Sequence, residues 1–384
     1  MAIRVLVTDD SAFMRKAISM ILEEDPGIEV VGTARDGQEA VEKVRELKPD
    51  LLTMDIEMPR MDGIAATREI MANTPLPIII ISSLTAEGAQ NTIEAMQAGA
   101  VDFITKEMSS ISYDLIQMKR QLTEKVKSVI QSHIKNIDVN SDVKRLRERY
   151  KARTPAKSHV DGILSSRKTL SRSNPIPAKS SGRAPVRRVT QPGFEHFQIV
   201  VIGISTGGPF SLQQIIPALP GDLNIPVAIV QHMPPHFTKS LADRLNTMSE
   251  LNVVEAEDGM EILPGNVYIA PGGQHLKFAK SGTKVLAKVT PDPQDVLFRP
   301  SVDVMFDSAN TVFGGNSLAV IMTGMGKDGL EGTRKIKNSG GYVIAQNEES
   351  CVVYGMPKAI VDAQLADHVL PLNQIAEAII RSVS

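Results

Sequence analysis

Cysteine and tryptophan are almost missing from this sequence of 384 residues. Cys351 is the only cysteine, tryptophan is absent, and aromatic residues make up 4% of the chain. A single cysteine excludes intramolecular disulfides and cysteine-rich metal sites. The chain also lacks a large excess of charge of either sign, because the net charge is -2. Composition therefore indicates no general preference for nucleic acid or membrane. The cores must therefore be built from aliphatic residues and the 17 methionines.

Long apolar runs are missing as well. No stretch approaches the roughly 20 apolar residues that a membrane-spanning helix needs. Asp9 and Asp10 directly follow the first short apolar run, a pattern that excludes a signal peptide. We therefore expect a cytoplasmic protein with no membrane insertion, and the length suggests two or three domains.

Residues 1–122 alternate short β-branched runs with amphipathic segments. This rhythm predicts a flavodoxin-like α/β domain with a five-stranded, doubly wound parallel sheet. A ligand site is expected beyond the carboxyl ends of its strands. The predicted strands are Ile3–Thr8, Ile28–Ala34, Asp50–Met54, Pro77–Ile81 and Val101–Thr105.

Residues 123–194 are interpreted as a helical extension followed by a flexible basic linker. The helical, highly charged pattern covers 119–150, and from Lys151 to Phe194 there are ten Lys/Arg and a single acidic residue, Asp161. As a random coil this linker would span roughly 35–40 Å between its ends. It could also bind nucleic acid or an anionic membrane surface, but it lacks interleaved aromatics, so we favour a solvated tether.

Residues 195–384 return to a βα rhythm and predict a Rossmann-like α/β domain with a mostly parallel sheet. Turn signals within Asn266–Val289 predict an antiparallel hairpin beside that sheet. The predicted strands are Gln198–Ile202, Pro226–Val230, Ser317–Met322 and Tyr342–Ala345. The predicted helices lie near Pro209–Ala218, Phe237–Met248, Gly329–Asn338 and Gln374–Ser382.

Charged and polar residues follow the strands of the first domain. Asp9 and Asp10 follow the first strand, Asp55 the third, Ser82 the fourth and Lys106 the fifth. Parallel strands bring these positions to one edge of the sheet, where clustered carboxylates suit Mg²⁺. Asp55 could then attack a phosphoryl group whose charge is neutralised by the metal and Lys106. Each residue alone could be a helix cap or a surface charge, but the full set predicts a phosphoacceptor pocket.

The first 120 or so residues resemble response-regulator receiver domains, through the Asp pair, Asp55 in LLTMDIEMP, Ser82 and Lys106. The resemblance implies phosphorylation of Asp55 by a chemotaxis histidine kinase. It implies that Mg²⁺ is bound by Asp9, Asp10, Asp55 and the backbone carbonyl of Glu57. It also implies that Ser82 and Lys106 contact the phosphoryl group and that Phe103 changes rotamer with phosphorylation. Receivers usually carry proline after the lysine, whereas Glu107 stands here, which puts a cis peptide bond in doubt.

The run GISTG places Ser205 at a strand-to-helix turn in the second domain. It satisfies G-x-S-x-G, the pattern of a strained turn that exposes a nucleophilic serine. A phosphate-binding loop or a helix N-cap would also explain it. A dinucleotide loop would need glycine in place of Ser205.

A nucleophilic serine needs a base and an orienting acid. His232 directly follows the predicted strand next to Ser205, with His236 as the reserve candidate, and His275 is expected to line the substrate cleft. Asp328, in MTGMGKDG, also follows a strand and could accept the second ring N–H of His232; a helix cap is its alternative role.

Two further residues compete for these roles. Asp303 is a second candidate acid, which we expect to hold the loops together with Arg299. Cys351 has no histidine near it in sequence and is interpreted as a packed residue.

Six motifs of the second domain together resemble chemotaxis protein-glutamate methylesterases, the CheB family. They are GISTGGP, QHMPPHFT, APGGQH, FRPSVD, TGMGKDG and VVYGMPKA. The resemblance implies a triad of Ser205, His232 and Asp328, with backbone N–H groups around Thr206 and Met325 as oxyanion donors. It implies hydrolysis of glutamate methyl esters and deamidation of glutamines on the cytoplasmic domains of chemoreceptors. We expect no metal in this half, no nucleic-acid partner and a monomer.

The pairing of a receiver with an enzyme suggests that the unphosphorylated receiver blocks the catalytic cleft. A DNA-binding output domain is the alternative. It would require a helix-turn-helix with basic recognition residues, whereas the second half of the chain carries glycine-rich loops at strand ends.

Overall fold

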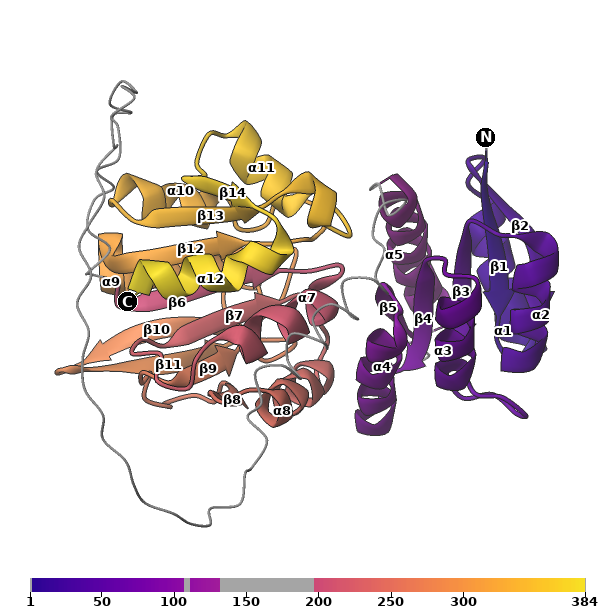
Figure 1. Ribbon diagram of the computed structural model, residues 1–384, viewed down its shortest axis with the longest axis horizontal. Helices are drawn as coiled ribbons and strands as arrows, with labels where there is room; N and C mark the ends of the chain where they lie inside the picture. The colour runs from indigo at the N-terminus through magenta and orange to yellow at the C-terminus, as the bar shows by residue number, and fades with distance from the viewer. Residues whose placement is uncertain (1, 107–110, 132–196, 384) are drawn as a thin grey trace, which may run out of the picture. The chain divides into compact units, whose positions relative to one another are not determined.

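The computed structural model describes residues 2–106, 111–131 and 197–383, with the backbone alone for 111–117. The two folded regions that flank the linker are shown in Figure 1. In the described residues, no helix combines the length and apolarity required to cross a bilayer. The predicted linker and the Lys106–Glu107 peptide bond lie outside the described residues.

The N-terminal domain is built on a five-stranded parallel sheet of order β2-β1-β3-β4-β5. The four isoleucines of β4 have no exposed surface, as expected for a strand covered by helices on both faces. The prediction of a doubly wound sheet is therefore confirmed. The strands are β1 (Ile3–Thr8), β2 (Ile28–Ala34), β3 (Leu51–Asp55), β4 (Ile78–Ser83) and β5 (Asp102–Lys106).

Each of the first four helices begins at a side-chain cap. Ser11, Asp36, Asp62 and Thr85 accept a hydrogen bond from a backbone N–H in the first turn, a contact typically worth about 1 kcal/mol. The fifth helix continues past residue 122, the domain boundary expected from the sequence. The helices are α1 (Ala12–Glu23), α2 (Gly37–Leu47), α3 (Gly63–Asn73), α4 (Ala86–Ala98) and α5 (Ile111–Gln131).

The C-terminal domain contains a seven-stranded sheet of order β14-β13-β12-β6-β7-β9-β8, in which every pair is parallel. The strand order reverses at β6, which lies between β12 and β7. Ligand sites in such sheets form at the reversal. The strands are β6 (Ile199–Ile204), β7 (Val227–Gln231), β8 (Asn252–Glu255), β9 (Asn266–Ile269), β12 (Ser317–Ile321), β13 (Tyr342–Gln346) and β14 (His368–Leu370).

The hairpin prediction was partly wrong. The antiparallel pair is β10 (His275–Ser281) with β11 (Lys284–Thr290). Asn266–Ile269, which the sequence assigned to the hairpin, instead forms β9 and pairs in parallel with both β7 and β8. The edge strands β8 and β14 were not predicted, because three or four residues show too little alternation to stand out.

Helices cover both faces of the large sheet, so β6 is buried along its whole length. Helix α7 packs against α8 and α12, whereas α9 packs against α10 and β10; Figure 1 shows α7 and α12 beside the sheet. The helices are α7 (Gly208–Ile215), α8 (Phe237–Met248), α9 (Val302–Phe313), α10 (Leu330–Asn338), α11 (Met356–Asp362) and α12 (Leu372–Val383), with short 3-10 turns at 216–218, 314–316 and 348–350.

Candidate active site and acidic pocket

Ser205 stands in the tight turn between β6 and α7. Gly208 N–H donates to the Ser205 carbonyl at 2.7 Å, and Ser205 N–H donates to the Thr323 carbonyl at 3.0 Å. Gly207 has φ of 77°, a left-handed conformation that favours glycine. A Cβ on Gly324 would lie 2.8 Å from Ser205 Cβ. The GISTG pattern therefore forms a nucleophile-elbow type of turn, with the loop that follows β12 packed directly against it.

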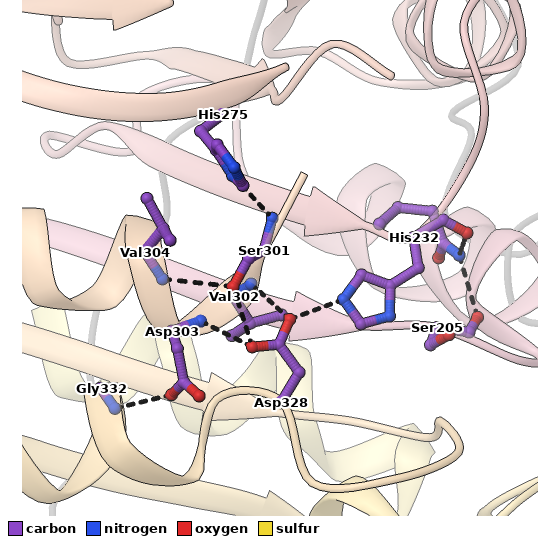
Figure 2. Close-up of polar contacts among 10 residues, drawn as sticks. Ser205, His232, His275, Ser301, Val302, Asp303, Val304, Asp328 and Gly332 are labelled. Carbon is purple, nitrogen blue, oxygen red and sulfur yellow. Dashed lines mark hydrogen bonds and ion pairs between the residues drawn. The ribbon is translucent and has the colours of Figure 1, made fainter. Parts of the chain in front are cut away.

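His232 follows β7, the neighbour of β6, and its N–H donates to the Ile204 carbonyl at 3.2 Å. Its ring Nε2 lies 2.8 Å from Asp328 Oδ2. Within the described residues, the buried Nδ1 has no hydrogen-bond partner. Figure 2 shows Ser205 on the far side of the imidazole from Asp328. The ring thus offers Nδ1, rather than Nε2, to the serine side of the site.

Asp328 follows β12 and lies at the N-terminus of α9. Its carboxylate accepts hydrogen bonds from Val302 N–H at 2.7 Å, Asp303 N–H at 3.0 Å and Ser301 Oγ at 3.0 Å, in addition to His232 (Figure 2). Burial alone would raise the pKa of Asp328, but the contact with His232 and the backbone N–H donors lower it below its usual value. The positive end of the helix dipole acts in the same direction. Asp328 is therefore held as an anion.

The resemblance implies that the backbone N–H groups of Thr206 and Met325 are oxyanion donors. In the part of the chain that the structure describes, neither Thr206 N–H nor Met325 N–H donates a hydrogen bond. Thr206 directly follows the serine, and Met325 directly follows Gly324, which packs on Ser205. Both N–H groups thus belong to the Ser205 turn or to the loop packed against it, and their oxyanion role stays a prediction.

The competing candidates make contacts different from those of His232 and Asp328. His236 is exposed at the start of α8. Asp303 donates its N–H to Asp328 at 3.0 Å and accepts Gly332 N–H at 2.7 Å (Figure 2), so it ties the start of α9 to α10. In the described residues it forms no ion pair with Arg299. Burial raises the pKa of the Cys351 thiol far above its usual value, which suits a packed residue.

His275 does not line a cleft, as the sequence suggested, because its side chain is fully buried. Its Nδ1 accepts Ser301 N–H at 3.2 Å, and its Nε2 lies 3.1 Å from the Pro293 carbonyl. Phe298 was missed by the sequence reasoning. Its ring stacks on His232 with the centroids 4.3 Å apart and an angle of 12° between the planes. An aromatic residue in a loop gives no sequence signal of such a contact.

The acidic residues of the N-terminal domain meet at the carboxyl ends of its strands. Carboxylate oxygens of Asp9, Asp10 and Asp55 all lie within 4.8 Å of one another. Lys106 Nζ bridges two of them, at 2.8 Å from both Asp9 Oδ2 and Asp55 Oδ2. The adjacent cavity of about 240 Å³ is lined by Asp10, Asp55, Ile56, Glu57, Ser82, Ser83 and Lys106. Three clustered carboxylates form a donor set that fits a hard divalent cation.

Burial shapes the electrostatics of this pocket. Desolvation raises the pKa of Asp55 to about 6, although Lys106 opposes the shift. The same burial would lower the pKa of Lys106, but Asp55 and Asp9 raise it above its usual value. Lys106 is therefore a fixed cation beside the carboxylate.

The two remaining predicted residues of the pocket are Ser82, which lines the same cavity as Asp10 and Asp55, and Phe103. The Ser82 hydroxyl donates to the Gly88 carbonyl at 3.1 Å, so it would have to turn to reach a phosphoryl group. Phe103 lies on β5, where Lys125 Nζ is 5.7 Å from its ring centroid.

The first domain has the fold and the acidic pocket of a receiver, and the second is a doubly wound domain with a Ser, His and Asp site. This combination defines a response regulator with a hydrolase output. The sequence matches the response regulator receiver domain over residues 5–117 and the CheB methylesterase family over residues 200–379. The chain belongs to the family of protein-glutamate methylesterases/protein-glutamine glutaminases, in which the receiver domain implies a divalent metal for phosphorylation.

Relatives match over the whole length. A protein-glutamate methylesterase/protein-glutamine glutaminase of Thermotoga maritima is 46% identical over 99% of this chain and 98% of its own. One of Oleidesulfovibrio alaskensis is 43% identical over 99% of both chains. The crystal structure of the Thermotoga maritima CheB methylesterase catalytic domain is 51% identical, with a TM-score of 0.48, over 49% of this chain and 99% of that one.

Proposed function

We propose that this protein hydrolyses glutamate methyl esters and deamidates glutamines on the cytoplasmic domains of chemoreceptors, with Ser205, His232 and Asp328 as its catalytic triad. The observation that carries the proposal is the chain of contacts around the imidazole. One ring nitrogen is bound to Asp328 at 2.8 Å while the other is buried, unpaired and directed to the side where Ser205 lies. This is the arrangement that a general base requires.

In the first half of the reaction His232 Nδ1 takes the proton of the Ser205 hydroxyl as Oγ attacks the ester carbonyl. The resulting imidazolium is stabilised by the Asp328 carboxylate, whose negative charge is in turn held by the N-terminus of α9. His232 then gives the proton to the departing methoxide, and methanol leaves. A glutamine side chain forms the same acyl-enzyme with loss of ammonia.

In the second half a water molecule attacks the acyl-enzyme while His232 accepts its proton, and His232 then returns the proton to Ser205 Oγ as the bond between Oγ and the acyl carbon breaks. The products are the glutamate carboxyl group and free Ser205. Negative charge on the carbonyl oxygen is stabilised in both halves by the N–H groups of Thr206 and Met325. Loss of one such donor typically costs about 2.7–4 kcal/mol of transition-state stabilisation.

The receiver domain supplies the regulation. A histidine kinase of the chemotaxis system would donate the phosphoryl group, and Asp55 would accept it. Asp9, Asp10, Asp55 and the Glu57 carbonyl would hold Mg²⁺, which neutralises charge on the phosphoryl group when bound. Lys106, already within 2.8 Å of Asp55, would bind the phosphoryl oxygens as a fixed cation. Ser82 would contribute its hydroxyl after turning from Gly88.

In the resting state the unphosphorylated receiver would block the catalytic cleft. Phosphorylation of Asp55 would activate the enzyme by releasing the receiver from the cleft. A phosphoryl group adds about -1.5 to -2 charges. Moving the equilibrium from 1:99 to 99:1 needs about 5.5 kcal/mol of differential stabilisation. The long linker expected from the sequence allows the domains to dock and separate.

The test is release of methanol from methylated receptor membranes, comparing wild type with Ser205→Ala. We expect loss of activity in the variant and an unchanged rate in Ser281→Ala, an exposed serine at the end of β10 that serves as a matched control. Full activity of Ser205→Ala would refute the nucleophile assignment.

A further inference from the structure

The imidazole of His232 has only one hydrogen bond in the described structure, the contact of Nε2 with Asp328. One bond fixes one atom of the ring and leaves its plane free to turn, because the χ2 torsion of histidine has broad minima. For Nδ1 to remain directed at Ser205, something else must fix the plane. The second contact of the ring is with Phe298.

Phe298 covers one face of the imidazole. The two rings are nearly parallel, with 12° between their planes and 4.3 Å between their centroids. A turn of the His232 ring about χ2 would drive its edge into the phenyl ring, so the stack opposes the motion that the Asp328 contact permits. The contact also removes water from that face, and the His232 side chain keeps 9% of its exposure.

Phe298 belongs to a segment, residues 293–301, that connects the β10–β11 hairpin to α9; we call it the brace. The brace has no strand or helix of its own, so its shape depends on contacts with its neighbours. Gly273 N–H donates to the Arg299 carbonyl at 3.1 Å, beside Phe298. The two ends of the brace are tied to one side chain, that of His275.

His275 is fully buried at the start of β10. Its Nδ1 accepts the N–H of Ser301 at one end of the brace, and its Nε2 can donate only to the carbonyl of Pro293 at the other. Both contacts are satisfied at once only by the neutral ring protonated on Nε2. Burial lowers the pKa of His275 and so favours this neutral form.

We propose that Phe298 is a positioning residue that fixes the plane of the His232 ring, and that His275 holds the brace in the shape that presents Phe298. The inference rests on the proposed role of His232 as the general base. It adds two residues that act through His232, one by direct stacking and one through the brace.

The test compares kcat and KM of the full-length phosphorylated protein for Phe298→Leu, Phe298→Met and Phe298→Tyr. Leucine and methionine stay apolar but cannot stack, so we expect kcat to fall about five- to tenfold, the loss of one aromatic contact at the base, with KM unchanged. Tyrosine keeps the ring and should restore the wild-type kcat. Phe313→Leu is the matched control, since that ring packs on Phe278 at the opposite end of α9.

Several outcomes would overturn the proposal. A wild-type kcat in both non-aromatic variants would remove the positioning role, and a rise in KM alone would make Phe298 a substrate contact. Tyrosine no better than leucine would mean that the ring is not what matters. Methionine serves as the second variant in case leucine prevents folding, which circular dichroism would reveal.

A double-mutant cycle tests the second half of the proposal. If His275 acts through Phe298, then His275→Asn combined with Phe298→Leu should cost no more in kcat than the larger single change. Additive losses would contradict the link. The variant His232→Gln separates this proposal from the proposed catalytic function. If His232→Gln is active, His232 is not the general base. If His232→Gln is inactive but Phe298→Leu is fully active, the positioning role of Phe298 is refuted and the base assignment stands.

Discussion

The carboxylate of Asp328 accepts the backbone N–H of Val302, the first residue of α9, at 2.7 Å. The same oxygen, Oδ2, lies 2.8 Å from His232 Nε2. One atom thus joins the N-terminus of a helix to the imidazole. The N-terminus of the helix holds the carboxylate as an anion, and the carboxylate holds one nitrogen of the ring, so the proposed base depends on a helix that contributes no side chain to the proposed reaction.

Removing the negative charge of Asp328 should strongly reduce kcat. Asp328→Asn keeps the shape of the side chain but presents either an uncharged acceptor or an N–H donor to His232. We expect kcat to fall by about 10⁴, as in other triads whose acid loses its charge. Methanol release measures this effect. Ser301→Ala, which removes one of the donors to Asp328, should show a much smaller loss, and equal losses would mean that the charge is not the important property.

Asp303 provides a test of stability against pH. Burial is the main cause that raises its pKa from 3.8 to about 6. The folded state therefore binds more protons than the unfolded state between these values, and stability falls as pH rises through that window. Asp303→Asn keeps an acceptor for Gly332 N–H and removes the charge beside Asp328.

We expect Asp303→Asn to stabilise the catalytic domain by about 1–2 kcal/mol at pH 7.5, allowing for solvent screening. The gain should shrink through about pH 6 to 4 and disappear below about pH 3, where the wild-type carboxyl is protonated in both states. Calorimetric Tm values of the two proteins at several pH values measure the difference. A constant difference in Tm across that range would contradict the assignment.

Removal of the metal should abolish activation through the receiver domain and leave the activity of the catalytic domain unchanged. With EDTA, we expect a small phosphodonor to lose its ability to activate the enzyme, while the basal rate of methanol release stays the same. Asp55→Asn should behave like the EDTA-treated wild type, because it lacks the attacking carboxylate. Loss of the basal rate on chelation would place a metal requirement in the hydrolase as well.

Deletion of residues 1–150 should raise the basal rate of methanol release if the unphosphorylated receiver blocks the cleft. Phosphodonor should then have no further effect on the fragment. Circular dichroism shows whether the fragment is folded. If a folded fragment has an unchanged or lower rate, the autoinhibition hypothesis is wrong. Asp55→Asn in the full chain is the control, since it keeps the receiver but cannot be phosphorylated.

The sequence by itself determined where the functional groups stand on their strands. Asp9, Asp10, Asp55 and Lys106 follow strands that hydrophobic runs revealed, and parallel pairing then brings them to one edge. The same logic placed Ser205, His232 and Asp328 after strands of the second domain, whereas only the observed sheet shows that these strands, β6, β7 and β12, are neighbours at the reversal. These predictions depend only on local periodicity and on a general rule of sheet topology, and both can be read along the chain.

The tertiary structure alone decided which atoms meet. Sequence order could not show that His232 Nε2 rather than Nδ1 faces Asp328, or that β9 leaves the hairpin for the large sheet. It gave no sign that Phe298 stacks on His232 or that His275 is buried beneath the brace. Each of these contacts joins residues distant in sequence whose approach depends on how several elements pack together, and periodicity along one segment carries no information about its partner.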